Sequence, residues 1–434
     1  TDTNPTLSLS GGRNGVKGES GASDDDLASE QMSHYSSTSE NASALEDATG
    51  NSRTYPSTTY LPTHPSTTYL PTVHTFAKTR QAALESLRQA FSSRVLYDFL
   101  TERRITVADS LERCLKKGGG EEQAAAATLF VLLCVQLGGG DEAEECFKML
   151  RPLFSAILID RGASVSARQS CARALGMCCY VSAAEDGEDL VRSMGQLEAV
   201  FMSSYPNREG ALPAAKPGHP ALFGAALQAW ALLVTLCPVS RLTKVVLLCP
   251  LSHLPKLQAC LESSDVNYRI AVGETIALLV ELGRDIDEDF EVEDSVGLCV
   301  SLKGLATDSN KHRAKNDRRK QRSIFREVLH YIEVRSDFQE EKIRFGVEGI
   351  YIDSWVRRRM YDAFKDLLES GVRHHLQFNC LLRDIFGLGA PLILDAAVKA
   401  NKISRFEKHL FNSAAFKART KLRNKVRDKR ADVM

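Results

Sequence analysis

The sequence predicts an all-α fold, and three observations support this prediction. From about Thr75 onward, apolar residues recur with a helical period. No segment shows the convincing alternation of apolar and polar residues that a half-buried strand requires. Glycine and proline punctuate the chain at short intervals and mark helix ends. These breaks lie at Gly118–Gly120, Gly138–Gly140, Gly162, Pro206–Pro220, Pro238, Pro250 and Pro255.

The segments between these breaks have helical lengths and are joined by short turns, which favours a stack of helices. The expected helices lie near residues 76–101, 105–117, 121–138, 141–160, 165–184, 186–203, 219–237, 239–249, 252–263, 266–284 and 291–304.

Two of these segments form a weak internal repeat. Val165–Ala183 (VSARQSCARALGMCCYVSA) and Val266–Arg284 (VNYRIAVGETIALLVELGR) align without gaps, with Arg168 opposite Arg269. The offset of 101 residues suits two or more units of the ~40–47-residue repeats of the HEAT and armadillo type. Chance similarity between two amphipathic helices is the alternative, but the helix lengths and turns favour a repeat. We therefore expect an armadillo/HEAT-like helical stack, an α–α superhelix, which offers extended surfaces to partners rather than a deep catalytic cleft.

The composition changes along the chain and predicts five regions. Residues 1–74 are expected to be a disordered, acidic, Ser/Thr-rich tail with a Pro-rich spacer, in which PSTTYLPT at Pro56–Thr63 recurs at Pro65–Thr72. The helical repeat domain spans 75–304, and a basic segment with an amphipathic helix spans 305–339. A small C-terminal helical domain spans 340–395, and a basic terminal helix spans 402–434. Asp285–Asp294, with seven acidic residues in ten, is expected to be a linker between the stack and the basic part.

The formal net charge of zero conceals a strong division of charge. From Lys303 to the end there are 30 Lys and Arg residues against 17 Asp and Glu residues, a net of +13, which leaves −13 for residues 1–302. Such an asymmetry indicates that the basic part meets a polyanion.

A soluble, reducing, intracellular setting is expected. The 11 cysteines include no CxxC pair, and no signal peptide is recognised. The apolar segment Ala124–Leu137 is too short to span a bilayer, and Ala221–Val239 is interrupted by Gln228 and Pro238. We therefore expect no membrane partner.

The sequence also lacks the motifs on which most catalytic sites are built. There is no HExxH, no GxSxG and no GxGxxG after a strand, and Gly11–Gly18 lacks the order of a phosphate-binding loop. His374 and His375 have no partner at i+4, and the nearest cysteine is Cys380, so core or surface histidines are expected instead of a metal site. The prediction is a protein that is not an enzyme, with no catalytic residues, no cofactor, no metal and no small-molecule substrate.

The first basic segment is Lys311–Arg322 (KHRAKNDRRKQR), in which seven of twelve residues are Lys or Arg. It continues into an amphipathic helix over Ser323–Val334. This segment resembles a nuclear localisation signal and can also contact nucleic acid, so a cytoplasmic protein with a nuclear pool is expected. The candidate RNA-binding residues here are Lys311, Arg313, Lys315, Arg318, Arg319, Lys320 and Arg322.

The second basic segment, Lys402–Met434, carries 11 basic residues against three acidic ones. On a helix these cations spread almost all round, and only a narrow apolar stripe remains. A solvated tail and a membrane-surface helix are alternatives, although the latter needs a broader apolar face. A salt-dependent contact with nucleic acid is favoured. Its candidate residues are Lys402, Arg405, Lys408, Lys417, Arg419, Lys421, Arg423, Lys425, Arg427, Lys429 and Arg430.

Several segments resemble the interferon-related developmental regulators. Arg344–Trp355 (RFGVEGIYIDSW), Tyr361–Lys365 (YDAFK), Ser370–Gln377 (SGVRHHLQ) and Leu382–Gly389 (LRDIFGLG) are similar to the family's C-terminal domain. Lys315–Glu333 is similar to the segment before that domain, and the acidic, Ser-rich Ser23–Glu40 is similar to the N-terminal region. The similarity is greater to the second paralogue than to the first. Residues 1–20 and the duplicated PSTTYLPT depart from the family pattern.

The resemblance implies an armadillo-like stack, a conserved C-terminal domain and no catalytic residues. It also implies binding to translationally inactive ribosomes, with rRNA and ribosomal proteins as partners. The body would occupy tRNA sites, and the C-terminal helix, about Ser404–Arg430, would enter the mRNA channel through contacts drawn from the basic residues between Lys417 and Arg430. The expected function is therefore repression of translation by occupancy. The alternatives are a nuclear transcriptional co-regulator scaffold that recruits co-repressors and an importin-like adaptor that carries peptides on residues 76–304.

Overall fold

The computed structural model of the chain describes residues 77–182, 187–214, 216–236, 251–308, 313–334 and 338–392, together with Ser413 and Lys417. The chain divides into a unit of Thr1–Thr67 and a unit of Thr68–Met434, and every described residue belongs to the second. The predicted tail, the predicted helix at 239–249 and nearly all of the predicted terminal helix lie outside the described residues.

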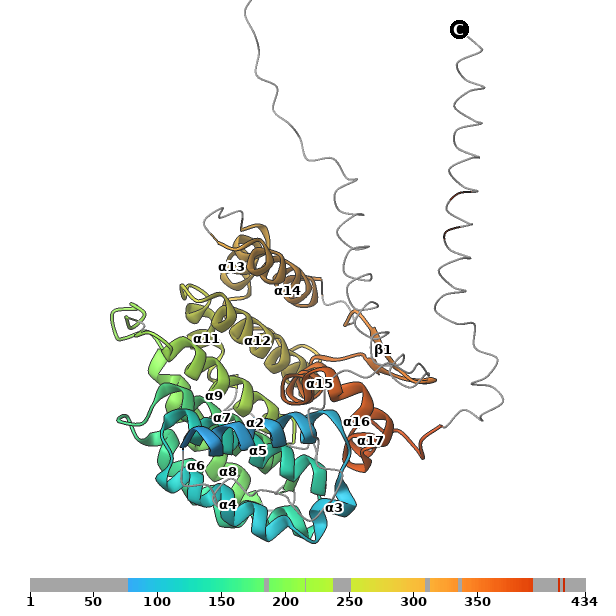
Figure 1. Cartoon of the computed structure of the whole chain (residues 1–434). Coiled ribbons are helices and arrows are strands. Elements are labelled where there is room, and N and C mark those ends of the chain that lie inside the picture. The colour runs from blue at the N-terminus through green and yellow to red at the C-terminus, as the bar shows by residue number, and fades with distance from the viewer. Residues whose placement is uncertain are drawn as a thin grey trace, which may run out of the picture. The chain divides into compact units, whose positions relative to one another are not determined.

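The described helices form two rows (Figure 1), which confirms the predicted all-α helical stack. In the inner row each helix packs on the next: α2 (Ala77–Ser93), α5 (Gly120–Leu137), α7 (Val165–Ser182), α9 (His219–Val234), α12 (Val266–Ile286) and α14 (Lys315–Glu333). The outer row is α4 (Arg104–Lys117), α6 (Asp141–Ile159), α8 (Gly187–Phe201), α11 (Leu254–Cys260) and α13 (Ser295–Thr307), and each of these packs on the inner helix that follows it. The short α3 (Tyr97–Thr101) and η3 (Met202–Ser204) lie in connections. None of the described helices is long and apolar enough to cross a membrane.

The two segments of the internal repeat begin with the same side-chain cap. The Ser164 hydroxyl accepts a hydrogen bond from the N–H of Ala167 at 3.1 Å, and the Asp265 carboxylate accepts one from the N–H of Tyr268 at 2.8 Å. Each cap satisfies an N–H group that the first turn of a helix leaves without a partner. The paired residues lie 101 positions apart, so the offset seen in the sequence also relates the two helix starts.

The two arginines that the repeat aligns make equivalent bonds. Arg168 donates to the carbonyl of Leu158, near the end of α6, at 2.9 Å. Arg269 donates to the carbonyl of Ser263, just after α11, at 2.7 Å. Arg168 therefore joins α7 to the end of α6, and Arg269 joins α12 to the turn that follows α11. This shared role is the physical reason for the repeated arginine.

The acidic segment Asp285–Asp294 is a connection between two neighbouring helices. Its first two residues, Asp285 and Ile286, are the end of α12. The Asp294 carboxylate caps α13 by accepting a hydrogen bond from the N–H of Gly297 at 3.0 Å. Beyond it, α13 packs on α14 and α14 packs on α12, so the two-row arrangement continues through the basic segment.

The prediction that no segment forms a strand is wrong for residues 341–352. Strands β1 (Glu341–Phe345) and β2 (Glu348–Ile352) pair in an antiparallel hairpin. Gly346, at φ +54°, makes the turn in the left-handed region that glycine adopts without strain. Five-residue strands are too short for a period of two to stand out against helical spacing. The hairpin leads into α15 (Trp355–Leu368), η4 (Glu369–Gly371), α16 (Val372–Phe378) and α17 (Cys380–Ile385).

The segment after the hairpin packs back onto the inner row. Helix α15 contacts α2, α5, α9 and α12, and its Phe364 lies edge-on to Tyr180 of α7, with ring centroids 6.3 Å apart. The inner helices are therefore covered by the outer row and also by α15. Helices α5 and α9 are accordingly apolar and buried around most of their circumference, as expected of helices enclosed on several sides.

Two buried polar side chains fix this packing. Asn379, which is 3% exposed, donates to the carbonyl of Val135 in α5 at 3.0 Å and caps α17. The Glu281 carboxylate of α12 accepts the N–H groups of Trp355 at 2.7 Å and Val356 at 3.0 Å, so it caps the start of α15. Both residues replace water as partners for backbone groups that are buried at the junction.

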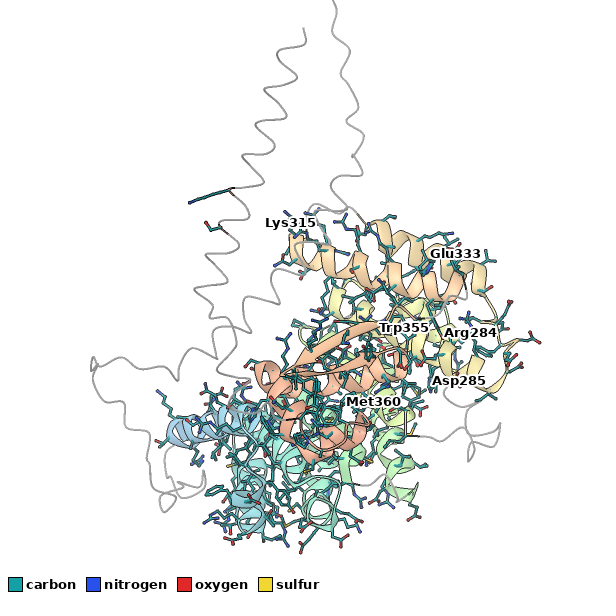
Figure 2. The ribbon with its side chains drawn as sticks, turned by 90° about the vertical axis from the view of Figure 1, so that its right-hand side faces the viewer. Arg284, Asp285, Lys315, Glu333, Trp355 and Met360 are labelled. Atoms are coloured by element: carbon teal, nitrogen blue, oxygen red, sulfur yellow. The ribbon has the colours of Figure 1, made fainter. Side chains whose placement is uncertain are left out.

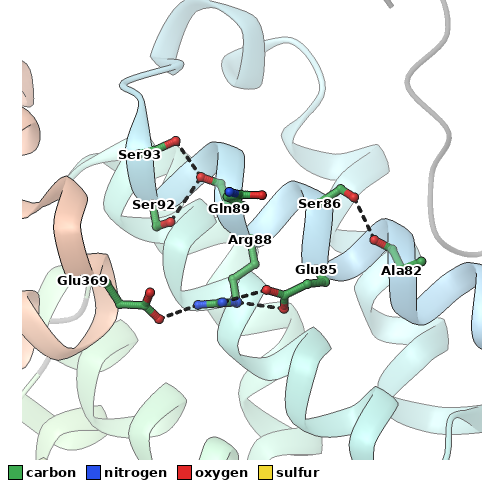
Figure 3. Close-up of polar contacts among 8 residues, drawn as sticks. All are labelled: Ala82, Glu85, Ser86, Arg88, Gln89, Ser92, Ser93 and Glu369. Atoms are coloured by element: carbon green, nitrogen blue, oxygen red, sulfur yellow. Dashed lines mark hydrogen bonds and ion pairs between the residues drawn. The ribbon is translucent and has the colours of Figure 1, made fainter. Parts of the chain in front are cut away.

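The C-terminal segment also meets the first inner helix. Arg88 of α2 bonds to Glu85 on its own helix and to Glu369 of η4, each at 2.7 Å (Figure 3). Beside this bridge, Gly371 lies so close to the backbone of Ser92 that a Cβ atom would overlap its carbonyl oxygen. Residues 281 positions apart in the sequence are therefore in direct contact.

A third buried polar residue, Arg383, joins α17 to the hairpin. Its guanidinium is paired with Glu348 of β2 at 2.8 Å, and this pairing lowers the pKa of the Glu348 carboxyl. The remaining N–H groups donate to the carbonyls of Leu376, Gln377, Gly389 and Ala390. Arg383 thus holds the last described stretch of the chain against the hairpin.

The close approach at Gly371 can be tested with a matched pair of substitutions. Gly371→Ala should lower the free energy of unfolding by about 1–3 kcal/mol, because the added Cβ forces η4 away from α2. Gly195→Ala, at an exposed position of α8 where a Cβ meets nothing, should raise it by about 0.5–1 kcal/mol. Urea unfolding of both variants measures the difference. A Gly371→Ala chain as stable as the Gly195→Ala chain would contradict this packing.

The buried cap at Glu281 predicts a pH dependence of stability. Burial raises the pKa of Glu281 from 4.5 to about 7, so the folded chain holds this proton more tightly than the unfolded chain. The contribution of Glu281 is therefore most favourable below pH 4.5. It falls by about 3 kcal/mol as the pH rises from 4.5 to 7, and then levels off.

Glu281→Gln cannot ionise, so its free energy of unfolding should fall by about 3 kcal/mol less than that of the unsubstituted chain between pH 4.5 and 7. Urea unfolding across that pH range measures this difference. Glu288→Gln, at an exposed position between α12 and α13, is the control and should leave the profile unchanged. An identical fall in both variants would show that Glu281 does not titrate as proposed.

Candidate nucleic-acid interface

Helix α14 carries most of the first predicted basic segment, and its buried face attaches it to the stack. Gln321, Phe325, Val328 and Ile332 are buried at helical spacing. The Phe325 ring lies directly against Gly273 of α12, where any side chain would collide with it. The helix is therefore held close to α12, and its opposite side faces outward.

A polar cluster holds the first turns of α14. Arg269 of α12 donates to the Gln321 side-chain oxygen, which also accepts a bond from Arg313 at 3.2 Å. Arg313 is paired with Asp308 at 2.8 Å, and the Gln321 amide donates to the carbonyl of Leu305 at 3.2 Å. Arg313, one of the predicted RNA contacts, thus makes its described bonds inside the fold and secures the start of the helix.

Four cations form a line along the outward side of α14, which we call the basic stripe: Lys315, Arg319, Arg322 and Arg326. Their spacing of four, three and four residues places them on one flank of a helix. Lys315 and Arg326 are exposed, and Arg319 and Arg322 are partly exposed. Figure 2 shows the helix between Lys315 and Glu333 at an edge of the described part of the chain. Because the helix is anchored, the stripe presents its charges in a fixed row.

The other predicted residues differ in position. Arg318 is partly exposed beside the stripe, and Lys320 is exposed on the flank where its charge reaches Glu274 of α12. Lys417 is exposed and helical. Lys311 and the other predicted residues from Lys402 to Arg430 lie outside the described residues, so their contacts with RNA remain predictions.

A second cluster of cations, Arg357 to Arg359 in α15, has internal partners. Arg358 is paired with Glu327 of α14, and Arg357 donates to the carbonyl of Phe386 at 3.2 Å. Burial and the charge of Asp362 raise the pKa of the Glu274 carboxyl to about 7, and the charge of Arg359 opposes this rise. Arg358 thus holds α15 to α14, and Arg357 holds it to the residue after α17, so a basic run in the sequence does not by itself identify a basic surface.

The histidine pair has no metal-binding geometry. His375 is completely buried, and burial lowers its pKa to about 4. The His374 ring packs on Phe378, with centroids 4.9 Å apart. Within the described ranges no three His, Cys, Asp or Glu side chains come together as metal ligands would.

One feature of this region was not predicted from the sequence. Tyr331, Phe338 and Trp355 line a cavity of about 360 Å³ beside the C-terminal half of α14. These residues come from α14, the segment before β1 and the start of α15. No local pattern brings them together, and the only signal in the sequence is that Trp355 is one of two tryptophans.

Comparison with known proteins agrees with the resemblance noted from the sequence. A family model described as "Interferon-related developmental regulator" matches residues 31–333, and one described as "Interferon-related protein conserved region" matches residues 379–431. Interferon-related developmental regulator 2 of Mus musculus is 55% identical over 359 residues, which cover 82% of this chain and 80% of that protein. Interferon-related developmental regulator 1 of Sus scrofa is 47% identical over 412 residues, which cover 95% and 90%, and the Homo sapiens protein is 47% identical over 412 residues with the same coverage. The chain therefore belongs to the interferon-related developmental regulator family, a family of regulators.

Proposed function

We propose that this chain is a non-enzymatic repressor of translation that binds ribosomes. It occupies the tRNA sites of inactive ribosomes and places its basic terminal helix, about Ser404–Arg430, in the mRNA channel. It acts by occupying these sites and performs no chemistry. Its partners are rRNA and ribosomal proteins, and it works in the cytoplasm with a possible nuclear pool.

The observation that carries this proposal is the concentration of positive charge on an anchored support. The chain from Lys303 to its end has a net charge of +13, and α14 presents part of that charge as the basic stripe. From Lys315 to Arg326 the stripe is about 16 Å long at 1.5 Å per helical residue. A row of cations on a helix that is already folded neutralises phosphates and releases counterions, and binding then costs less conformational entropy than it would for a flexible chain.

The absence of an RNA-reading fold among the described elements favours recognition of backbone and shape over recognition of sequence. The described part contains no four-stranded sheet with exposed aromatics, and its one sheet has two strands. Contacts from Lys and Arg to phosphate give position and affinity but carry no base information. Such binding suits a large structured RNA.

The stripe can be tested by charge reversal. The triple variant carries Lys315→Glu, Arg322→Glu and Arg326→Glu. The slope of log affinity for purified ribosomes against log salt concentration should become less steep by roughly 2–3, because each lost phosphate contact removes about 0.7–0.9 from that slope. Affinity at low salt should fall by at least roughly tenfold. The matched control reverses three exposed cations elsewhere, Arg161, Arg208 and Lys216. Equal losses in the two variants would mean that net charge alone, and not the stripe, governs binding.

The terminal segment is tested by truncation. A chain ending at Ile403 lacks ten of the 11 basic residues of the second basic segment, and should lose both its salt-sensitive co-sedimentation with ribosomes and its inhibition of cell-free translation. Sucrose gradients at low and high salt measure the first property. Co-sedimentation of the shortened chain that is undiminished and equal at the two salt concentrations would contradict the proposal.

The alternative is a nuclear transcriptional co-regulator scaffold. The exposure of Lys315 on α14 supports it, since a basic run must be accessible to an import receptor. Cell fractionation separates the two functions: a pool that is mostly nuclear and free of ribosomal RNA would favour the scaffold.

A further inference from the structure

The cavity beside α14 is walled by three aromatic rings. The Trp355 ring lies edge-on to Tyr331, with centroids 6.0 Å apart, and edge-on to Phe338, with centroids 5.3 Å apart. The ring planes are inclined by 68° and 87°, so they form adjoining walls and do not stack on one another. Trp355, labelled in Figure 2, is the first residue of α15, and its contact with Tyr331 places it beside α14. The cavity volume of about 360 Å³ leaves room for a flat group against these walls.

The cavity opens next to the basic stripe. Arg326, the last residue of the stripe, also lines the cavity, together with His330 one turn further along α14 and Gln339 before β1. Arg326, His330 and Gln339 are all exposed, whereas Trp355 is 2% exposed. A chain of phosphates that follows the stripe therefore reaches an apolar, aromatic recess at its end.

The charges around the cavity decide which flat group it suits. Among the lining residues that the structure describes, Glu327 is the only carboxylate, and it is paired with Arg358. The Arg358 guanidinium already lies over the Phe338 and Trp355 rings, at 5.3 and 5.6 Å from their centroids. A cationic ligand such as a quaternary ammonium would meet Arg326 and Arg358, and the described lining offers it no unpaired carboxylate. A neutral nucleobase has no such conflict, and the phosphate attached to it is attracted by Arg326.

We propose that this cavity binds one unpaired nucleobase of an RNA strand whose phosphates lie along the basic stripe. The inference rests on the proposed RNA-binding function and adds a site at which a base is held. The base packs against the partly exposed Tyr331 and Phe338 rings, as unstacked bases of single-stranded RNA do on aromatic side chains, and Trp355 forms the buried floor behind them. The Gln339 amide offers one donor group and one acceptor to the edge of the base. Stacking tolerates any base, so the site adds affinity without strong sequence preference.

Tryptophan fluorescence reports on this site directly. The chain has two tryptophans, and Trp230 is 1% exposed in the core. The full chain carrying Trp230→Phe leaves Trp355 as the only indole. A short single-stranded oligoadenylate should quench its emission in a saturable way, and an abasic RNA of the same length, which offers phosphates alone, should not.

Substitution of the cavity wall tests affinity. Phe338→Ala should weaken oligoadenylate binding roughly 5- to 100-fold, the usual effect of losing one base–aromatic stack, and leave the affinity for the abasic RNA unchanged. Phe338→Tyr keeps a ring and should retain the original affinity, which separates loss of stacking from loss of folding. Tyr97→Ala, an exposed aromatic of α3, is the control.

The outcomes distinguish this inference from the proposed function. If oligoadenylate and abasic RNA bind equally well, or if Phe338→Ala and Tyr97→Ala behave alike, the nucleobase site is wrong while the stripe remains supported by its salt dependence. If neither RNA binds the unsubstituted chain, the site and the RNA-binding function fall together.

Discussion

Inner helices that are apolar around most of their circumference must be covered on more than one side, and the described structure follows from this requirement. Helices α5 and α9 cannot stand at the surface of a stack with only one outer row beside them. The outer row covers one side, and α15 covers another by crossing from α12 to α2. The segment after the hairpin is thus part of the same core as the repeats. If the chain acted as an importin-like adaptor, its peptides could not bind to the part of the inner row that α15 covers.

Burial alone would leave the position of α15 loosely defined, and a few buried polar groups define it. Glu281 accepts hydrogen bonds from two backbone N–H groups, and Asn379 donates one to a backbone carbonyl. Without these side chains the backbone groups would be left without partners at the junction. Each such bond contributes about 0.5–1.5 kcal/mol of net stability, whereas removing one partner and leaving the other buried costs about 1–3 kcal/mol. Gly371 adds a steric condition, because only a residue without a side chain permits this approach to α2. Together they set where Trp355 lies against α14, and therefore where the aromatic cavity forms.

The same packing separates the cations of this region by position. Arg313 and Arg358 make ion pairs within the fold, whereas Lys315 and Arg326, the two ends of the basic stripe, are exposed on α14. An internal arginine keeps its charge but contributes little to the field that a distant polyanion meets, since its partner cancels it. The exposed positive surface of α14 and α15 is consequently smaller than their number of Lys and Arg residues implies. It lies along α14, next to the aromatic cavity. This arrangement links the proposed ribosome binding to the proposed nucleobase site.

The helical stack, its repeat and the basic character of the C-terminal third could be predicted from the sequence, because periodicity, caps and charge are properties of neighbouring residues. The alignment of Arg168 with Arg269 is apparent from the sequence alone, whereas the carbonyls that they bond are not. The family was equally accessible, since it depends on short motifs such as RFGVEGIYIDSW. Only the tertiary structure decided that residues 341–352 form a hairpin, that Arg313 turns inward and that Tyr331, Phe338 and Trp355 share a cavity. Each of these depends on contacts between residues distant in the chain, and no local pattern encodes which elements will meet.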